Sequence, residues 1–442
     1  MENILVSVVV AVYNAEPYLC KCLDTVLGQT LREIEVICVD DGSTDESLRI
    51  LREYEQKDQR VRVISQKHAD AGAGPARNAG LEVARGKYLS FLDADDFFDT
   101  TMLEKTVRKA EQCQADIVLF DAYSYDHKTG ALTEPAFILN KAFIPNQDVF
   151  TWKDVPDNIF RICIGAAWNM LCGRDFVFDN RLRFQAVHHA DDMVFAFSAL
   201  IKARRITVLN EKLLYYRQNN ASSQSQTKSH WPDTAYLALR EVKARLSEYG
   251  MYDEVRRSFV NRGADYLCWY LDTMASWESF RFLWLKLKDS YFSELDISGH
   301  ASDYFYESGL YEWRERIMRQ EPEEWIFAEY LKSKSTNANI LHHPLPAERI
   351  PKGSRIALYG AGTVGKAYFA QCLCMEHCKI VLWADRRAES LGYPVERPER
   401  LRELQCDAVL IAIADQKTAR QIRDYLIDIG IDLKKIIYGA EL

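Results

Sequence analysis

Residues 88–98 are Tyr-Leu-Ser-Phe-Leu-Asp-Ala-Asp-Asp-Phe-Phe, an apolar run that ends in a cluster of carboxylates. The apolar part predicts a strand, and Asp93, Asp95 and Asp96 follow directly at its end. Carboxylates this close together repel one another unless a cation with oxygen ligands offsets their charge. In α/β folds, ligands bind just past the carboxyl ends of parallel strands. The stretch therefore predicts a divalent-cation site, with a solvated acidic turn as the alternative.

Apolar runs upstream of this stretch predict the rest of a parallel sheet. Residues 4–12 form a continuous aliphatic run, and residues 34–39 and 61–65 form shorter ones. Such runs are typical of strands that are buried on both faces. Helical segments separate them, and Pro17 suits the first turn of the first helix. The alternation of strand and helix predicts an α/β fold whose crossovers bring the loops after the strands to one edge of the sheet.

These loops carry side chains that suit a nucleoside diphosphate. A carboxylate can accept the imide N–H of uracil or a ribose hydroxyl, and arginine binds phosphate in a bidentate way. A cation held by Asp95 or Asp96 can bridge the two phosphates. We therefore expect a nucleotide site whose candidate residues are Val12, Tyr13, Glu16, Asp40, Asp41, Arg77, Asp93 and Asp95.

Four motifs in this half share the order and spacing of those in a known family. They are Ser7-Val-Val-Val-Ala-Val-Tyr-Asn14, Val39-Asp-Asp-Gly-Ser-Thr-Asp45, Gly74-Pro-Ala-Arg-Asn-Ala-Gly80 and Phe91-Leu-Asp-Ala-Asp-Asp96. The chain resembles family 2 glycosyltransferases with the GT-A fold, over roughly residues 4–225. The resemblance implies a UDP-sugar donor and Mg²⁺ or Mn²⁺ at an Asp-x-Asp (DXD) motif.

The same resemblance implies roles for individual residues. Asp41 is expected to contact the nucleotide base, and Arg77 the nucleotide or phosphate region. Asp93 and Asp95 are expected to bind the ribose and the metal. Asp96 is a further candidate for the metal or the donor sugar, so the choice of metal ligand among these three aspartates stays open.

A second acidic pair lies further along the chain. Residues 188–195, His-His-Ala-Asp-Asp-Met-Val-Phe, resemble the Glu-Asp element of the family, with Asp191 where Glu is common. An inverting transfer needs a base for the proton of the acceptor hydroxyl. We expect Asp192 to be that base, with Asp191 as its neighbour or as the alternative. The pair can also cap the helix that follows. Arg217 is expected to bind the diphosphate or to pair with a nearby carboxylate.

The second half of the chain predicts further parts. The domains are expected at 1–225 (GT-A), 226–335 (an aromatic-rich helical extension), 336–353 (a linker) and 354–442 (a small Rossmann-like module). In the last module Gly360, Gly362 and Gly365 open a helix, and Asp385 follows a second strand, as in dinucleotide-binding folds. These glycines can instead serve only the tight turn and helix packing, so a nucleotide bound to this module stays open.

Composition narrows the location and the partners. The net charge of −8, without a dense basic stripe, argues against nucleic acid as a partner. No apolar run approaches the roughly 20 residues of a membrane span, and the first residues lack a signal-peptide pattern. We expect a cytoplasmic protein, with peripheral membrane contact and a homodimer both left open.

Together these features predict an inverting hexosyl- or N-acetylhexosaminyltransferase. Its partners would be a nucleotide-sugar donor and a hydroxyl of a surface-polysaccharide or lipid-linked glycan acceptor. One alternative is a nucleotidyltransferase, which usually has a basic glycine-rich loop where this chain has residues 13–16, Tyr-Asn-Ala-Glu. The other is a catalytically weak nucleotide- or dinucleotide-binding regulatory protein, against which the intact carboxylates argue.

Overall fold

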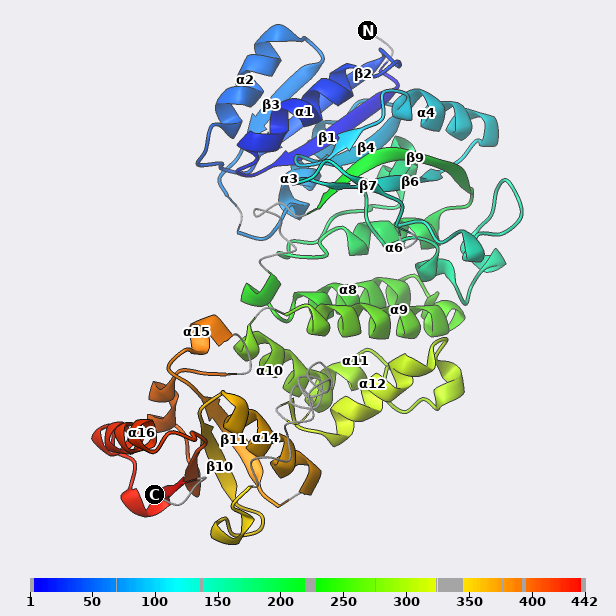
Figure 1. The fold of residues 1–442 in the computed structure, drawn as a ribbon. Helices are drawn as coiled ribbons and strands as arrows, with labels where there is room; N and C mark the ends of the chain where they lie inside the picture. Colours follow the sequence, from blue (N-terminus) through cyan, green and yellow to red (C-terminus); the bar gives the residue numbers. More distant parts are fainter. Residues whose placement is uncertain are drawn as a thin grey trace. The chain divides into compact units, whose positions relative to one another are not determined.

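The structure is a computed structural model that describes residues 4–68, 70–135, 138–218, 228–274, 276–322, 324, 345–375, 377–391 and 395–438 (Figure 1). Its internal contacts divide the chain into two compact units. One comprises Met1–Thr273 and Asp289–Tyr311, and the other comprises Met274–Lys288 and Glu312–Leu442. The domain boundaries expected at residues 225 and 335 lie outside the described residues, and the one expected at residue 353 stays a prediction.

The first unit begins with the predicted parallel sheet. Its strands are β1 (Val6–Val12), β2 (Ile34–Asp40), β3 (Val61–Ser65) and β4 (Tyr88–Asp93). The crossover helices are α1 (Glu16–Leu27), α2 (Ser47–Lys57) and α3 (Gly74–Val83). The strands lie parallel in the order β3-β2-β1-β4. Val12 stands opposite Asp40 and Ala11 opposite Asp93, so the candidate nucleotide-site residues share one edge of the sheet. The predicted α/β fold is confirmed.

The sheet continues with strands that run in both directions. They are β8 (Met170–Gly173), β6 (Ile117–Asp126), β9 (Ile206–Gln218) and β5 (Phe97–Phe98), with β7 (Leu132–Thr133) beside β6. The helices of this part are α4 (Met102–Cys113), α5 (Arg174–Asp179) and α6 (Met193–Lys202), with short 3-10 turns η1 (Lys141–Phe143), η2 (Trp152–Asp154) and η3 (Ile159–Arg161). β5 pairs antiparallel with β9 and therefore ties the acidic turn to the second half of the sheet.

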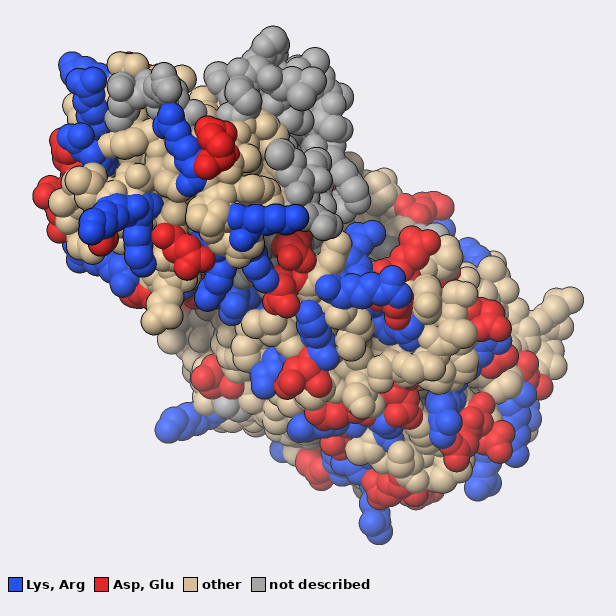
Figure 2. All heavy atoms as spheres, turned by 90° about the horizontal axis from the view of Figure 1, so that it is seen from below, with Lys and Arg blue, Asp and Glu red and all other residues tan. Residues whose placement is uncertain are grey.

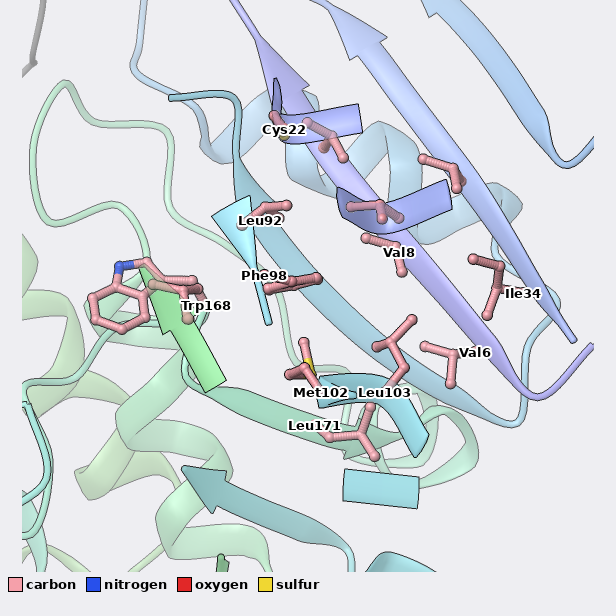
Figure 3. Close-up of a cluster of buried hydrophobic side chains, with 14 of the residues drawn as sticks. Val6, Val8, Cys22, Ile34, Leu92, Phe98, Met102, Leu103, Trp168 and Leu171 are labelled. Carbon is pink, nitrogen blue, oxygen red and sulfur yellow. The ribbon is translucent and has the colours of Figure 1, made fainter. Parts of the chain in front are cut away.

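The core of this unit lies between the sheet and the helices that cover it (Figure 3). Val8 on β1, Leu92 on β4 and Phe98 on β5 are at most 1% exposed, and they pack in one cluster with Cys22 and Leu103 from the helices. Burying one side chain of this size stabilises a fold by ~1.5–3 kcal/mol. The strand ends that carry the candidate site residues are therefore held in a packed frame.

Gly80 sets how closely α3 approaches the sheet. A Cβ atom at Gly80 would lie 2.4 Å from Cγ1 of Val9 on β1, which is closer than packed atoms approach. The absent side chain lets α3 pack directly on β1. Arg77 stands one helical turn before Gly80, and this packing brings it to the carboxyl end of β4, where it meets Asp93.

A helical layer follows the sheet within the first unit. It comprises η4 (Lys228–His230), α8 (Thr234–Glu248), α9 (Tyr252–Asp272), α11 (Phe292–Glu294) and η6 (Ser302–Tyr304). α8 packs against α6, and α9 packs against α8 and η3 (Figure 1). Tyr236 and Tyr270 are buried here, whereas Trp269 is 47% exposed. No helix in the part of the chain that the structure describes is long and apolar enough to cross a membrane.

The second unit contains the predicted Rossmann-like module. Its strands are β10 (Arg355–Tyr359), β11 (Lys379–Ala384), β12 (Ala408–Ile411) and β13 (Ile436–Tyr438), all parallel, in the order β11-β10-β12-β13. The module's helices are α14 (Thr363–Met375), α15 (Ala388–Leu391) and α16 (Gln416–Asp428), with 3-10 turns η8 (Ala347–Arg349), η9 (Pro398–Arg402) and η10 (Leu433–Lys435). Before it the chain forms α10 (Trp277–Lys286), a π-helical turn η5 (Leu287–Tyr291) and α12 (Ser308–Arg319). The small parallel sheet confirms the predicted fold class of this module.

Charged side chains of both signs are interspersed on the face drawn in Figure 2. This mixture accompanies a net charge of −8 for the whole chain. A nucleic-acid-binding face would instead gather Lys and Arg side chains.

Candidate active site

The acidic turn lies between β4 and β5. Asp96 is 1% exposed, and its Oδ1 accepts a hydrogen bond of 2.7 Å from the backbone N–H of Arg217. Its Oδ2 is buried without a hydrogen-bond partner among the described residues. Burial, followed by the charges of Asp95 and Asp93, raises the pKa of Asp96 well above its usual value. A buried, unpartnered carboxylate oxygen among like charges has the chemistry of a cation ligand.

The carboxylates of the acidic turn suit a hard divalent cation that takes its remaining ligands from water and substrate. In the residues that the structure describes, no three His, Cys, Asp or Glu side chains come together as a ready metal cage. Mg²⁺ sites at nucleotides commonly use one or two carboxylates, with waters and substrate phosphates completing the shell. Asp95 and Asp96 fit such a partial set, whereas Asp93 already forms an ion pair with Arg77.

Arg77 connects the two acidic elements that the sequence singled out. It is 5% exposed, and its guanidinium forms ion pairs with Asp93 through Nη2 and with Asp191 through Nη1. Burial lowers the pKa of Arg77, but Asp191 and Asp93 together raise it by more, so the side chain is a permanent cation. Arg77 thus joins the end of β4 to the segment before α6. Its expected contact with the nucleotide stays a prediction.

Two glycines before Arg77 explain how Asp191 reaches it. A Cβ atom at Gly72 would lie 2.1 Å from the carbonyl oxygen of Val187, and one at Gly74 would lie 2.1 Å from that of Gln185. The loop before α3 therefore lies directly against residues 185–187. The backbone N–H of Gln185 in turn donates a 3.1 Å hydrogen bond to the carbonyl of Asp191. These glycines serve close packing, a role that sequence analysis did not assign to them.

Asp192 occupies the position before the first residue of α6. Its side chain makes no capping hydrogen bond to that helix, so Asp192 does not cap α6 through its side chain. Burial and the charge of Asp191 raise the pKa of Asp192 to about 7, against a lowering influence of Arg77 and of the Ala167 backbone N–H. Asp191 itself is buried, and burial raises its pKa although Arg77 opposes the change. A carboxylate that titrates near neutrality is matched to general-base work.

Polar side chains at the ends of β2 and β3 surround Asp41. The carboxylate accepts hydrogen bonds from Nε2 of Gln66 (2.6 Å) and lies 2.7 Å from Nδ1 of His68. The ring of His68 stacks on Tyr13, with centroids 4.1 Å apart. Gln66 and His68 were not singled out in the sequence. Their position just after β3, beside the end of β2, is the signal that could have found them.

The remaining candidates of this edge hold the loops together. The carbonyl of Val12 accepts a 2.8 Å hydrogen bond from the N–H of Asp41. The buried Asp40 accepts from the backbone N–H of Ser43 at 3.3 Å. Glu16 lies at the start of α1, where its Oε2 accepts from the N–H of Glu46 at 3.3 Å. These contacts position the loops, and contact with a nucleotide stays a prediction for all three.

Arg217 braces the acidic turn from β9. Its Nε donates a 2.6 Å hydrogen bond to the carbonyl of Asp95, in addition to the backbone bond to Asp96. Its guanidinium lies over the rings of Tyr18 (4.9 Å) and Tyr125 (5.1 Å). Arg217 is therefore buried against aromatic rings, and its expected contact with the diphosphate stays a prediction.

In the second unit the fingerprint residues mostly support their own loop. Gly360 has φ +109°, and a Cβ atom at Gly365 would lie 1.9 Å from the carbonyl oxygen of Gly360. Asp385 accepts hydrogen bonds from the N–H groups of Ala361 (2.8 Å) and Arg387 (2.9 Å). Gly362 alone of the three glycines has open space where a Cβ would stand. Nucleotide binding by this module stays a prediction.

Known proteins resemble parts of this chain. A family model described as "Glycosyl transferase family 2" matches residues 7–166. The uncharacterized glycosyltransferase EpsJ of Bacillus subtilis is 35% identical, over 49% of this chain and 61% of its own length. The putative glycosyltransferase EpsH of the same organism is 31% identical, over 58% of this chain and 73% of its own length.

More distant proteins extend the comparison. The poly(ribitol-phosphate) beta-glucosyltransferase of Bacillus spizizenii is 28% identical, over 59% of this chain and 40% of its own length. The crystal structure of S. aureus TarS 1-349 in complex with UDP-GlcNAc has a TM-score of 0.57 and 19% identity, over 76% of this chain and 93% of that one. The likeness to TarS concerns the fold. The match with this chain covers less than two thirds of EpsJ and of the beta-glucosyltransferase.

Proposed function

This chain belongs to glycosyl transferase family 2, and from that membership we propose that it is an inverting sugar transferase with Asp192 as its general base. The observation that carries the proposal is the environment of Asp192. Its carboxylate is half-buried, has a pKa of about 7, and is coupled through Arg77 to the acidic turn at the end of β4. A base and a leaving-group site are thus linked by one buried side chain.

The proposed reaction is a single displacement. The acceptor hydroxyl oxygen attacks the anomeric carbon, the bond from that carbon to the diphosphate breaks, and Asp192 takes the hydroxyl proton. A divalent cation held by Asp95 and Asp96 would neutralise charge on the departing diphosphate. Arg77 holds Asp191 beside the base, and Arg217 holds the turn in place.

The proposed donor is a UDP-hexose or UDP-N-acetylhexosamine, and the proposed acceptor is a hydroxyl of a surface polysaccharide or its lipid-linked precursor. TarS, whose fold is similar, has been crystallised with UDP-GlcNAc, and a relative glucosylates poly(ribitol phosphate) by its name. Asp41, with Gln66, His68 and Tyr13, is the proposed pocket for the uracil base. UDP release from a panel of UDP-sugars, with glycan and polyol-phosphate acceptors, tests the proposal. The anomeric configuration of the product, determined by NMR, tests whether the transfer inverts. A chain that releases no UDP from any donor would refute the proposed function.

We expect the turnover number to depend on pH through Asp192. The base must be ionised to accept a proton, and its pKa is about 7. Turnover should therefore be maximal above that value and fall by about tenfold per pH unit below it. The measurement is kcat at saturating donor and acceptor, with the dissociation constant of UDP determined at each pH as a control for binding. A kcat that stays constant from about pH 6 to pH 8 would contradict the assignment.

We expect transfer to require a divalent cation at the acidic turn. A chelator should abolish turnover, and Mn²⁺ or Mg²⁺ should restore it. In the Asp95→Asn and Asp96→Asn variants, the metal concentration for half-maximal activity should rise by about 10-fold or more. The Asp58→Asn variant is the matched control, because Asp58 precedes the start of β3 and the candidate site lies past the end of that strand. Its metal concentration for half-maximal activity should equal that of the wild type. Full activity in the chelator, with unchanged variants, would show that the turn holds no catalytic metal.

A further inference from the structure

The helix α9 runs past the proposed base, and we propose that its face with Tyr266 and Trp269 is the acceptor subsite, which holds a pyranose or polyol unit beside Asp192. This inference rests on the proposed function and adds to it the place and chemistry of the second substrate. Three other aromatic side chains of α8 and α9, Tyr236, Tyr252 and Tyr270, are buried and belong to the core of the helical layer.

One set of contacts joins α9 to the base through residues 164–167. Nη2 of Arg262 on α9 donates a 2.9 Å hydrogen bond to the carbonyl of Ile164. Three residues later, the backbone N–H of Ala167 lies near enough to the carboxylate of Asp192 to lower its pKa. A short, continuous stretch of chain therefore touches both α9 and the base.

A second set of contacts reaches the same place from another side. The hydroxyl of Tyr270 on α9 donates a 3.1 Å hydrogen bond to the carbonyl of Trp231. The ring of Trp231 stacks on His188, with centroids 3.7 Å apart and planes 17° apart. His188 precedes Asp192 by four residues. α9 is thus fixed on two sides of the acidic pair.

Tyr266 stands between these anchors, one helical turn from Arg262 and from Tyr270. Burial, followed by the charges of Tyr270 and Asp192, raises the pKa of its phenol, so at neutral pH it is a neutral hydroxyl within the field of the base. The side chain is half-buried, so part of it is accessible to a ligand. A donor and acceptor of this kind suits a sugar or polyol hydroxyl.

Trp269 supplies the apolar part of the subsite. Its ring centroid lies 5.5 Å from that of Tyr266, and it is 47% exposed. The large hydrophobic side chains exposed in the described part of the first unit are Tyr13, Leu132 and Trp269. Tyr13 lies at the proposed uracil pocket. In this proposal the exposed ring of Tyr13 contacts the donor, and the exposed ring of Trp269 contacts the acceptor. An indole beside a hydroxyl matches a pyranose ring, which offers an apolar C–H face and polar edges.

The test separates acceptor binding from donor chemistry. In Trp269→Ala the acceptor KM should rise by about tenfold or more, and in Tyr266→Phe by about two- to tenfold. In both variants the slow release of UDP to water without acceptor, the dissociation constant of UDP and the melting temperature should stay as in the wild type. The acceptors used are short ribitol-phosphate and β-linked N-acetylglucosamine oligomers.

Tyr249→Phe and Leu132→Ala are the matched controls. Tyr249 stacks against Lys202, with 3.7 Å from Nζ to the ring centroid, at the end of α6 that is roughly 15 Å of helix away from Asp192. Both controls should leave every constant unchanged. Wild-type acceptor KM values in Tyr266→Phe and Trp269→Ala, with transfer intact, would overturn the subsite alone. A wild-type chain that transfers no sugar would overturn the proposed function and this inference with it.

Discussion

An Asp192→Asn variant is expected to transfer sugar at least about 10²–10⁴-fold more slowly than the wild type, while binding UDP equally well. The amide keeps the shape of the carboxylate but cannot take the proton of the acceptor hydroxyl. The variant should fold at least as stably, because burial and the charge of Asp191 disfavour the ionised form of Asp192. The measurements are kcat for transfer, the dissociation constant of UDP and the melting temperature.

Two further variants make this result specific. Asp191→Asn should lower both activity and stability, because it removes a partner of Arg77 as well as a neighbour of the base. Asp175→Asn, an exposed residue of α5, is the matched control and should change neither. Turnover of Asp192→Asn at the wild-type rate would exclude Asp192 as the base. Asp191 would then be tested as the alternative.

An Arg77→Met variant is expected to lose about 3–5 kcal/mol of folding free energy, together with most of its activity. Methionine fills a similar volume but leaves Asp93 and the buried Asp191 without their shared cation. Arg77 also lowers the pKa of Asp192, so its removal should raise that pKa. Less of the base is then ionised at pH 7, and the rise of turnover with pH should move to higher pH. Urea unfolding and the pH profile of kcat measure the two effects.

A double-mutant cycle separates the ion pair from simple loss of packing. Combining Arg77→Met with Asp191→Asn should recover part of the lost stability, because the second change removes the unpaired buried charge. Arg49→Met on the surface of α2, where Arg49 pairs with Glu46 and Glu53, is the control and should unfold as the wild type does. Additive losses in the cycle would show that Arg77 and Asp191 are not coupled.

Much of the fold follows from local sequence pattern. The runs at residues 4–12, 34–39 and 61–65 became β1, β2 and β3 because continuous aliphatic residues favour strands buried on both faces. β13, Ile436–Tyr438, was not expected, since three residues carry no periodicity to recognise. β6 extends to Asp126, because pairing with β9 stabilises polar residues that propensity alone would not hold in a strand.

The sequence singled out many of the candidate-site residues, though not Gln66 and His68, and it did not reveal the contacts between them. Asp93 and Asp192 were identified from motif resemblance, and the strand-end rule places the first at the edge of the sheet. Arg77 and Asp191 are 114 positions apart, and no local rule brings them together. The close packing at Gly72 and Gly74, which makes the pair geometrically feasible, depends on the path of residues 185–187. Contacts of this kind arise from tertiary structure alone.

The guanidinium of Arg77, which pairs with both Asp93 and Asp191, has a consequence for how proton binding and metal binding influence each other. The charge of Asp93 raises the pKa of Asp192, so neutralising the end of β4 lowers that pKa and ionises the base. Thermodynamic reciprocity then requires that a divalent cation bind the acidic turn more tightly when Asp192 is ionised and more weakly when Asp192 is protonated. We therefore expect the affinity of the acidic turn for a divalent cation to vary with pH through a carboxylate at the start of α6, with Arg77 as the side chain that lies between the two sites.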